Sequence, residues 1–220
     1  MSDVRKNLGV VPHPRRGTII VNLKDFVHDV YPQPFAPNPL NQELGAQLHK
    51  AFREFAINFY RPTTKTNLNE WEILQALKRR CPHEAEGEYD RAIHRARLIY
   101  NEFKRAYRQG LIHGVPPCGD RNIKISNGIF LKGKASLLAE NTGELYVLKT
   151  FSLHFPLKQE MPDVFYQVIG LSLLYPPPWR LWLCGFSGTG QLQAKIVEPS
   201  PEDREKFVKE LYLYVKKRKR

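Results

Sequence analysis

A face of basic side chains on one predicted helix is the first feature of this sequence that suggests chemistry. Arginine and lysine recur at three- and four-residue intervals between Glu86 and Gly110, opposite an apolar face. A stripe of this kind can neutralise the phosphates of a nucleic acid, and an ordinary solvated helix carries similar charges. The sequence favours the two interpretations equally. The stripe consists of Arg91, Arg95, Arg97, Lys104, Arg105 and Arg108.

Two further groups of residues suit contact with nucleic acid. The chain ends in five consecutive basic residues, 216–220, which we expect to be mobile and to add nonspecific phosphate affinity through Lys217 and Arg218. In a eukaryotic host the same run would serve as a localisation signal. Arg180 follows Trp179 directly after three prolines, where an indole beside a guanidinium can stack on bases, although plain packing is the simpler interpretation of Trp179.

Charge and composition favour a polyanionic partner. The 220 residues carry 34 Lys and Arg against 22 Asp and Glu, a formal net charge of +12. DNA is the expected partner, with RNA as an open alternative. Three widely spaced cysteines, Cys81, Cys118 and Cys184, form no CxxC pair, which predicts reduced thiols and a cytoplasmic, reducing location. The sequence has no run of about 18 apolar residues, so we expect no membrane partner.

The elements that must position these residues follow from the spacing of apolar side chains. Residues 1–40 form a proline-rich arm, which we expect to be irregular apart from a strand-prone run at 17–21 and to wrap the body or contact a protein partner. From Asn41, the predicted N-cap, an apolar period of three and four predicts a helix up to Pro62. Further helices are predicted after Asn69 and from Glu86 to Gly110.

The second half of the chain has a different pattern, because after residue 114 the apolar period falls toward two. Strands are predicted at 123–125, 128–132, 135–138 and 145–151, with a hairpin turn at 141–143. An apolar helix at 163–175, strands at 179–186 and 191–197, and a helix from Ser200 follow. This order predicts an α/β fold with a mixed central β-sheet flanked by helices, in a single domain of residues 41–215 between the arm and a basic tail at 216–220.

Several of these segments resemble the motifs of RecB-type nucleases, a branch of the PD-(D/E)XK superfamily. The family places a glycine and a histidine four residues apart on its first helix. It continues with paired strands, usually written G-x-I-D and D-Y-K-T, and a helix that opens with glutamine. The resemblance extends over about residues 41–215 and implies the PD-(D/E)XK nuclease-like fold. The matching residues are Gly45, His49, Gly133, Lys149, Thr150 and Gln167.

The resemblance also implies a divalent-metal site. In this family two strand acids bind Mg²⁺ or Mn²⁺, the histidine completes the metal site, the lysine orients the attacking water, and the glutamine helps to hold the substrate strand. His49, Lys149 and Gln167 would take the last three roles. Ser136 and Val147 occupy the two acid positions, and a hydroxyl is a poor ligand for such an ion while valine supplies none.

Acids at other positions offer only a partial replacement. Glu54 follows His49 on the same predicted helix, so a migrated carboxylate there is conceivable. Glu144 lies five residues before Lys149, an odd number, so the two side chains face opposite sides of a strand. Glu140 lies near the hairpin turn, away from the centre of the strand.

These observations predict a nucleic-acid-binding protein on a nuclease-like scaffold with a decayed metal site, working without a cofactor in a larger nucleoprotein or mobile-element assembly. The first alternative is an active DNA nuclease that uses Mg²⁺ or Mn²⁺ held by His49, Glu54 and a hairpin acid around Lys149. The second is a structural component of a virion or ribonucleoprotein that uses the arm for protein contacts.

Overall fold

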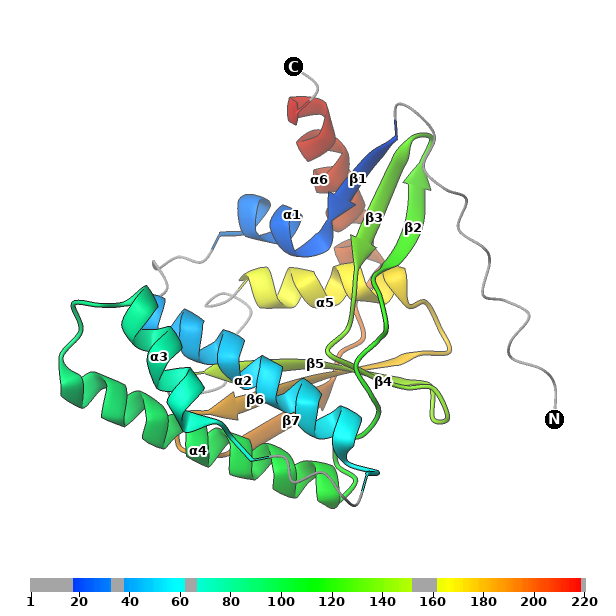
Figure 1. Ribbon diagram of the computed structural model, residues 1–220. Coiled ribbons are helices and arrows are strands. Elements are labelled where there is room, and N and C mark those ends of the chain that lie inside the picture. The colour runs from blue at the N-terminus through cyan, green and yellow to red at the C-terminus, as the bar shows by residue number, and fades with distance from the viewer. Residues whose placement is uncertain (1–17, 33–37, 62–66, 152–161, 219–220) are drawn as a thin grey trace.

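The computed structural model describes residues 18–32, 38–61, 67–151 and 162–218, and it has an α/β fold in which helices flank mixed sheets (Figure 1). In the described ranges the elements are β1 (Ile19–Asn22), α1 (Leu23–Val30), α2 (Pro39–Asn58), α3 (Glu70–Arg80), α4 (Glu86–Arg108), β2 (Arg121–Ser126), β3 (Ile129–Gly133), β4 (Leu137–Ala139), β5 (Glu144–Phe151), α5 (Pro162–Leu174), β6 (Arg180–Ser187), β7 (Leu192–Ile196) and α6 (Pro201–Arg218).

The strands form two sheets. The central sheet has the order β4-β5-β6-β7, in which β5 and β6 run parallel and the outer pairs run antiparallel. A second sheet has the order β1-β3-β2, with β1 parallel to β3. The prediction of one mixed central sheet is therefore corrected to two, because the second half of the chain supplies β2 and β3 to a sheet that the predicted arm completes.

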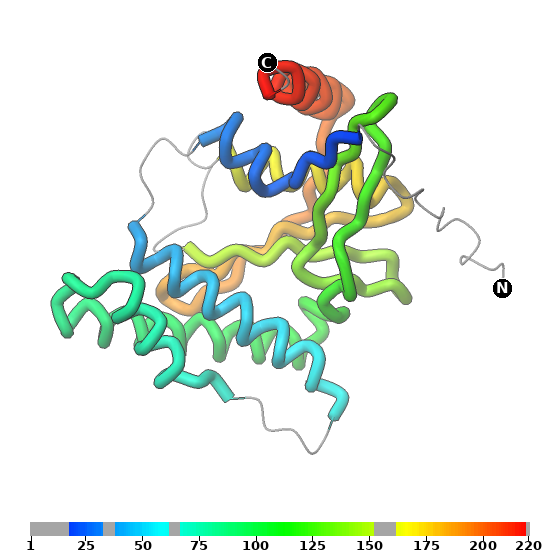
Figure 2. Tube along the Cα trace, turned by 45° about the horizontal axis from the view of Figure 1, so that its top comes forward, coloured from blue at the N-terminus to red at the C-terminus, as the bar shows by residue number. Residues whose placement is uncertain are grey.

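The central sheet separates two apolar cores, and β5 contributes to both because successive side chains point to opposite faces. Leu145 and Val147 face the core built with α1, α5 and α6. Tyr146 and Leu148 face the core built with α2, α3 and α4. Figure 2 shows α1, α5 and α6 together on one side of the central sheet and α2 to α4 on the other. A side chain's position along β5 thus decides which set of helices it meets.

The described part of the predicted arm belongs to the folded body. Asn22 caps α1 by accepting hydrogen bonds from the N–H groups of Lys24 and Asp25 at 2.9 and 3.5 Å. Phe26 is fully buried against Phe207 of α6, with the two ring centroids 5.1 Å apart. The expectation of an irregular arm is wrong for residues 19–30, because packing against α5 and α6 stabilises this short helix. Residues 1–17 and 33–37 lie outside the described part.

Most of the other predicted elements are confirmed, with small shifts in their bounds. The helix predicted from Asn41 begins three residues earlier, because Asn38 is its cap and Pro39 its first residue. Asn69 caps α3 as predicted. The turn between β4 and β5 contains Gly143 at φ 67°, a conformation that glycine adopts without strain. None of the described helices is long and apolar enough to span a membrane.

Candidate functional site

The short length of β4 creates an opening beside β5. In the described structure β4 pairs with β5 only from Glu144 to Tyr146. Beyond that point the N–H of Leu148 donates to the hydroxyl of Ser136 at 3.0 Å, so a side chain replaces the missing strand neighbour. The helix α2 approaches the same strand closely, and a Cβ on Gly45 would lie 3.1 Å from Oγ1 of Thr150. The glycine of the predicted helix motif therefore permits this approach.

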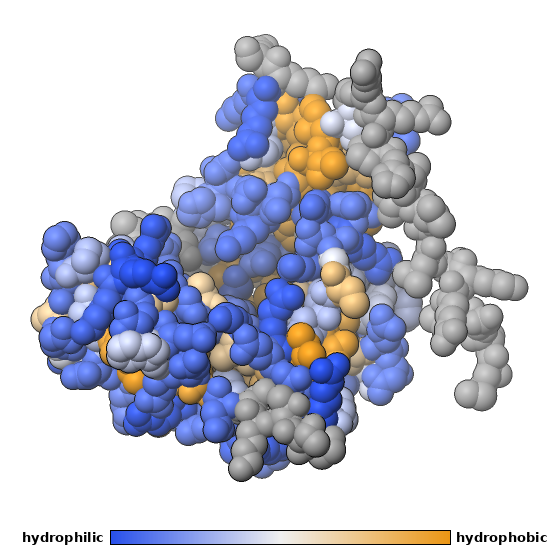
Figure 3. Space-filling view, viewed as in Figure 1, coloured by the Kyte–Doolittle hydropathy of each residue, from blue (hydrophilic) through white to orange (hydrophobic). Residues whose placement is uncertain are grey.

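A cavity of about 380 Å³ lies between this edge of β5, the start of α1, α2 and α5. Figure 3 shows the recessed middle of this face with hydrophilic side chains gathered around it. The structure thus brings together residues that the resemblance selected from distant parts of the sequence. Its polar and charged lining consists of Asn22, Lys24, His49, Arg53, Asp120, Lys134, Ser136, Lys149 and Gln167.

Lys149 reaches the cavity from β5 and meets α5. Its side chain shares a face with Val147 because the two lie two residues apart on a strand. The partly buried ammonium donates a hydrogen bond of 2.6 Å to Oε1 of Gln167. Burial lowers the pKa of Lys149, the charge of Asp163 acts against this, and the charge of Lys24 lowers it further. The predicted lysine and glutamine are therefore direct partners.

His49 enters the cavity from α2 as a neutral imidazole. Burial lowers its pKa to about 4, and the charges of Lys149 and Lys24 add to this effect. Near pH 7 the ring therefore offers a hydrogen-bond donor and an acceptor without a charge. His49 and Lys149 therefore line the same cavity.

The donor set around the cavity does not fit Mg²⁺ or Mn²⁺. These ions require several oxygen ligands, most of them anionic. The hydroxyl of Ser136 already accepts a hydrogen bond from the N–H of Leu148, and the side chain of Val147 has no ligand atom. The carboxylate of Asp120 is paired with Lys132, with Nζ 3.0 Å from Oδ2. In the described ranges no three His, Cys, Asp or Glu side chains come together as a metal site.

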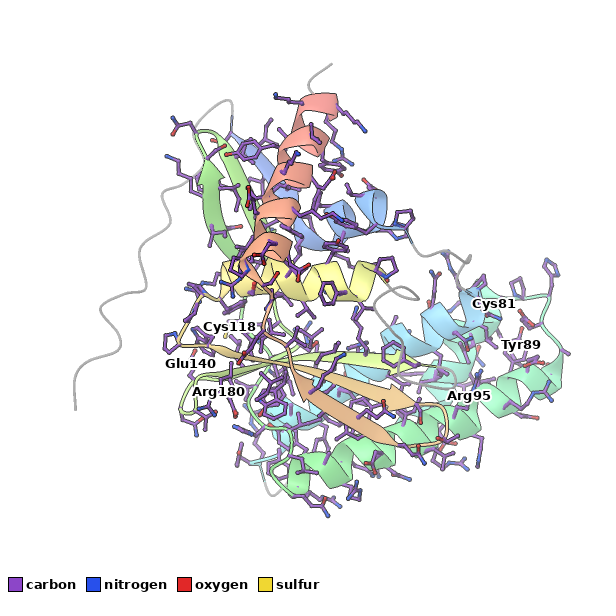
Figure 4. The ribbon with its side chains drawn as sticks, turned by 180° about the vertical axis from the view of Figure 1, so that it is seen from behind. Cys81, Tyr89, Arg95, Cys118, Glu140 and Arg180 are labelled. Carbon is purple, nitrogen blue, oxygen red and sulfur yellow. The ribbon has the colours of Figure 1, made fainter. Side chains whose placement is uncertain are left out.

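The acids considered as replacements lie elsewhere. Glu54 is exposed on α2, where its charge raises the pKa of Lys50, and it does not line the cavity. Glu140 is exposed at the hairpin (Figure 4). Glu144 accepts hydrogen bonds from Tyr146 and Trp182 at the start of β5. Its odd separation from Lys149 places the two side chains on opposite faces of the strand, as predicted. None of the three lines the described cavity with His49.

Much of the predicted basic stripe on α4 is paired with acids. Arg105 donates two hydrogen bonds to Glu102 at 2.6 and 2.7 Å. Arg97 donates two to Glu70 of α3, both at 2.8 Å. Arg91 is paired with the acid three residues before it. Exposed pairs of this kind contribute only about 0–1 kcal/mol, but they make the stripe less cationic than its sequence suggests.

The other predicted contacts with nucleic acid do not form one surface. Lys104 lies over the ring of Tyr100, 4.9 Å from its centroid, and burial lowers the pKa of this lysine. Arg108 is exposed near the end of α4. Arg95 and Arg180 lie at opposite ends of the central sheet in Figure 4. The stripe and Arg180 therefore cannot grip one short stretch of phosphates together.

The predicted tail is partly helical. Residues 216–218 complete α6, and only residues 219 and 220 lie outside the described part. The guanidinium of Arg218 bonds to Oδ2 of Asp29 at 3.0 Å and lies 4.5 Å from the ring centroid of Tyr214. Lys217 is exposed. The expectation of a mobile tail is wrong for residues 216–218, because Arg218 is held against α1.

Several residues of the cavity were not expected from the sequence. Lys24 comes from the supposed arm, and Lys134 follows β3. Arg53 lies four residues after His49. Residues four apart share a face of a helix, so this spacing could have identified Arg53.

Comparisons with known proteins support the fold and leave the function open. No protein-family model matches the chain, and no curated protein matches it. One similar solved structure is a crystal structure of a protein from Eubacterium rectale described as "Putative exonuclease". The two chains are 9% identical, with a TM-score of 0.51 over 89% of this chain and 78% of that chain. This likeness shows a shared α/β fold.

Proposed function

We propose that this chain binds nucleic acid on a PD-(D/E)XK nuclease-like scaffold of the RecB type that has lost its divalent-metal site. One observation carries the proposal. The cavity contains His49, Lys149 and Gln167, and it is also lined by Ser136 and Val147, the residues that the resemblance aligns with the two metal-binding acids. A scaffold that keeps substrate-facing groups without metal ligands retains the means to bind a strand but not to hydrolyse it.

The charge of the molecule supports the same function. A formal net charge of +12 attracts polyanions over a long range, and release of counterions from phosphates supplies affinity without reading the base sequence. The cations around the cavity are Lys24, Arg53, Lys134 and Lys149. Exposed arginines that are paired on α4 contribute less. Binding should therefore centre on the face that contains the cavity.

Binding to labelled oligonucleotides tests the proposal. We would measure fluorescence anisotropy with single-stranded DNA, duplex DNA and RNA of one sequence, in EDTA and in Mg²⁺, between about 50 and 200 mM salt. The expected result is binding that is unchanged by EDTA and falls at least about tenfold across this salt range. The same mixtures, incubated with Mg²⁺ or Mn²⁺, should contain only intact strands.

Two results would overturn the proposal. One is the absence of binding to all three oligonucleotides at low salt. The other is metal-dependent cleavage by the wild-type chain that is lost on substitution Lys149→Met, which would show that the cavity is an active nuclease site. Asp163→Asn would then be the next variant, because Asp163 is the carboxylate whose charge acts on Lys149.

A further inference from the structure

The charged groups around the cavity are those of an anion-binding site. Four cations reach it from four segments: Lys24 from α1, Arg53 from α2, Lys134 from the residues after β3, and Lys149 from β5. The carboxylate among the described lining residues is that of Asp120. Its oxygens lie 3.0 Å from Nζ of Lys132 and 3.8 Å from Nζ of Lys134. The positive charges of the lining therefore outnumber the negative charge.

We propose that this cavity binds a phosphate group of a nucleic acid directly, and that Lys24, Lys134 and Lys149 supply the positive charge that a metal ion would otherwise provide. This inference rests on the proposed function and states where the strand is held. It also gives a role to Lys24 and Lys134, which match no motif of the resemblance.

Lys149 is the cation that most needs such a ligand. An ammonium has three N–H donors, and the bond to Gln167 uses one of them. Its removal from water lowers its pKa most, the charge of Asp163 opposes this in part, and the charge of Lys24 lowers the pKa further, so the charged form is disfavoured where it stands. A phosphate beside it would oppose the two lowering effects, because an anion stabilises a buried cation and screens it from a second one.

The uncharged lining fits the same ligand. Near pH 7 neutral His49 can donate a hydrogen bond to a phosphate oxygen without opposing the surrounding lysines. Asn22 caps α1 beside Lys24, so this side of the cavity is a fixed helix start. Phosphate oxygens only accept hydrogen bonds from such a lining, which is why anionic groups are held by donors and cations together.

The size of the cavity restricts the source of the phosphate. At about 380 Å³ it lies near the lower end of the range of ligand pockets, about 300–1,000 Å³, and it takes a phosphate with part of its sugar but not a duplex. Two sources share this chemistry: an internal phosphodiester of a single strand, and a phosphomonoester at a strand end. The experiment has to separate them.

The test removes single cavity charges and compares them with a charge removed elsewhere. Lys24→Ala and Lys134→Ala replace exposed side chains, and Lys209→Ala is a matched control, because Lys209 is exposed on α6 and does not line the cavity. Each cavity variant should weaken binding of a single strand about tenfold, as expected for a lost charged hydrogen bond, and reduce the salt slope by about one. The control should change affinity less than about twofold.

The same strands with and without a terminal phosphate identify the source. A loss confined to phosphorylated ends would support a phosphomonoester ligand, and an equal loss for both would support an internal phosphodiester. Equal affinity of wild type, Lys24→Ala and Lys134→Ala for every strand would overturn the cavity as the phosphate site, while nucleic-acid binding elsewhere on the chain would stand.

Inorganic phosphate separates failure of this inference from failure of the proposed function. Phosphate should raise the Tm of the wild type and of Lys209→Ala above that in chloride of equal ionic strength, and it should do so less for Lys24→Ala and Lys149→Met. That result without any oligonucleotide binding would support an anion site and overturn nucleic-acid binding. A phosphate effect that is equal in all four proteins would overturn the site.

Discussion

The two ends of β5 differ in how the fold accommodates a charged side chain. At its start, the carboxylate of Glu144 accepts hydrogen bonds from the hydroxyls of Thr142 and Tyr146 at 3.0 and 3.1 Å, and from the indole of Trp182 at 3.1 Å. Nε2 of His113 lies 3.1 Å from the same carboxylate. Every one of these partners belongs to the body of the protein, so the charge is satisfied internally.

Near the other end of the strand, Lys149 has a different environment. It bonds to Gln167 and faces a cavity whose charged lining is mostly cationic. A carboxylate surrounded by donors stabilises the fold, whereas an ammonium beside other cations is stabilised further by an added anion. The charge at one end of β5 is thus balanced by the protein and the charge at the other is not, and we expect function at the end that faces the cavity.

Substitution of Glu144 should have the largest effect on stability. Glu144→Leu removes the acceptor of three hydrogen bonds, which costs about 3 kcal/mol at roughly 1 kcal/mol each. Urea unfolding at pH 7 measures this loss. The control is Glu140→Leu, which places the same substitution on an exposed side chain and should leave the unfolding midpoint nearly unchanged. An equal loss in the two variants would contradict the structural role of Glu144.

The same carboxylate should add to stability only above acidic pH. Burial acts to raise the pKa of Glu144, but the bonds from Thr142, Trp182 and Tyr146 outweigh it, so the pKa is lowered. A carboxylate with a lower pKa in the folded state stabilises the fold above its unfolded pKa, and this contribution is lost as the pH falls through the folded pKa. Glu144→Leu should therefore differ least from the wild type in acid.

Local patterns were sufficient to predict most elements. The cap at Asn69 and the start of α4 at Glu86 depend on neighbouring residues, which is why spacing revealed them. The joint placement of His49 and Lys149 was expected from the resemblance to RecB-type motifs, and both side chains line the one cavity.

Long-range contacts explain what was missed. α1 has only eight residues and depends on packing against α6, so its sequence between prolines resembled an irregular arm. Lys24 was missed with it. The pairing of Arg97 with Glu70 joins residues 27 positions apart, and no local pattern shows that the charge of this arginine is already neutralised. The parallel pairing of β1 with β3 has the same non-local origin.

His49, which lines the cavity, should make the free energy of unfolding depend on pH. Its pKa is lowered to about 4 in the fold, against 6.5 as the ordinary value, so the unfolded chain binds a proton more readily. This contribution to the free energy of unfolding is present above pH 6.5 and falls by about 3 kcal/mol as the pH decreases toward 4. His49→Gln should remove this part of the slope in urea unfolding, and His94→Gln, a substitution on the exposed face of α4, should preserve it. A wild-type slope in His49→Gln would contradict the neutral, enclosed histidine.

Substitutions of Ser136 should change stability least. They separate the stability of β5 from binding at the cavity. Ser136→Ala removes the acceptor of the Leu148 N–H and should cost about 1 kcal/mol, with little effect on binding of a single strand. Ser136→Asp keeps an acceptor there but adds an anion to the cationic cavity, so it should bind the strand several-fold more weakly while unfolding at nearly the wild-type urea concentration.

Anisotropy in EDTA and in Mn²⁺ separates the two interpretations of that aspartate. If the cavity holds a phosphate through its lysines, the binding lost in Ser136→Asp is not restored by Mn²⁺, because one added carboxylate beside Val147 is too few ligands for the ion. Restoration of binding by Mn²⁺ would instead show that the cavity still tolerates a metal. The lysines would then be partners of the metal-bound strand rather than substitutes for the ion.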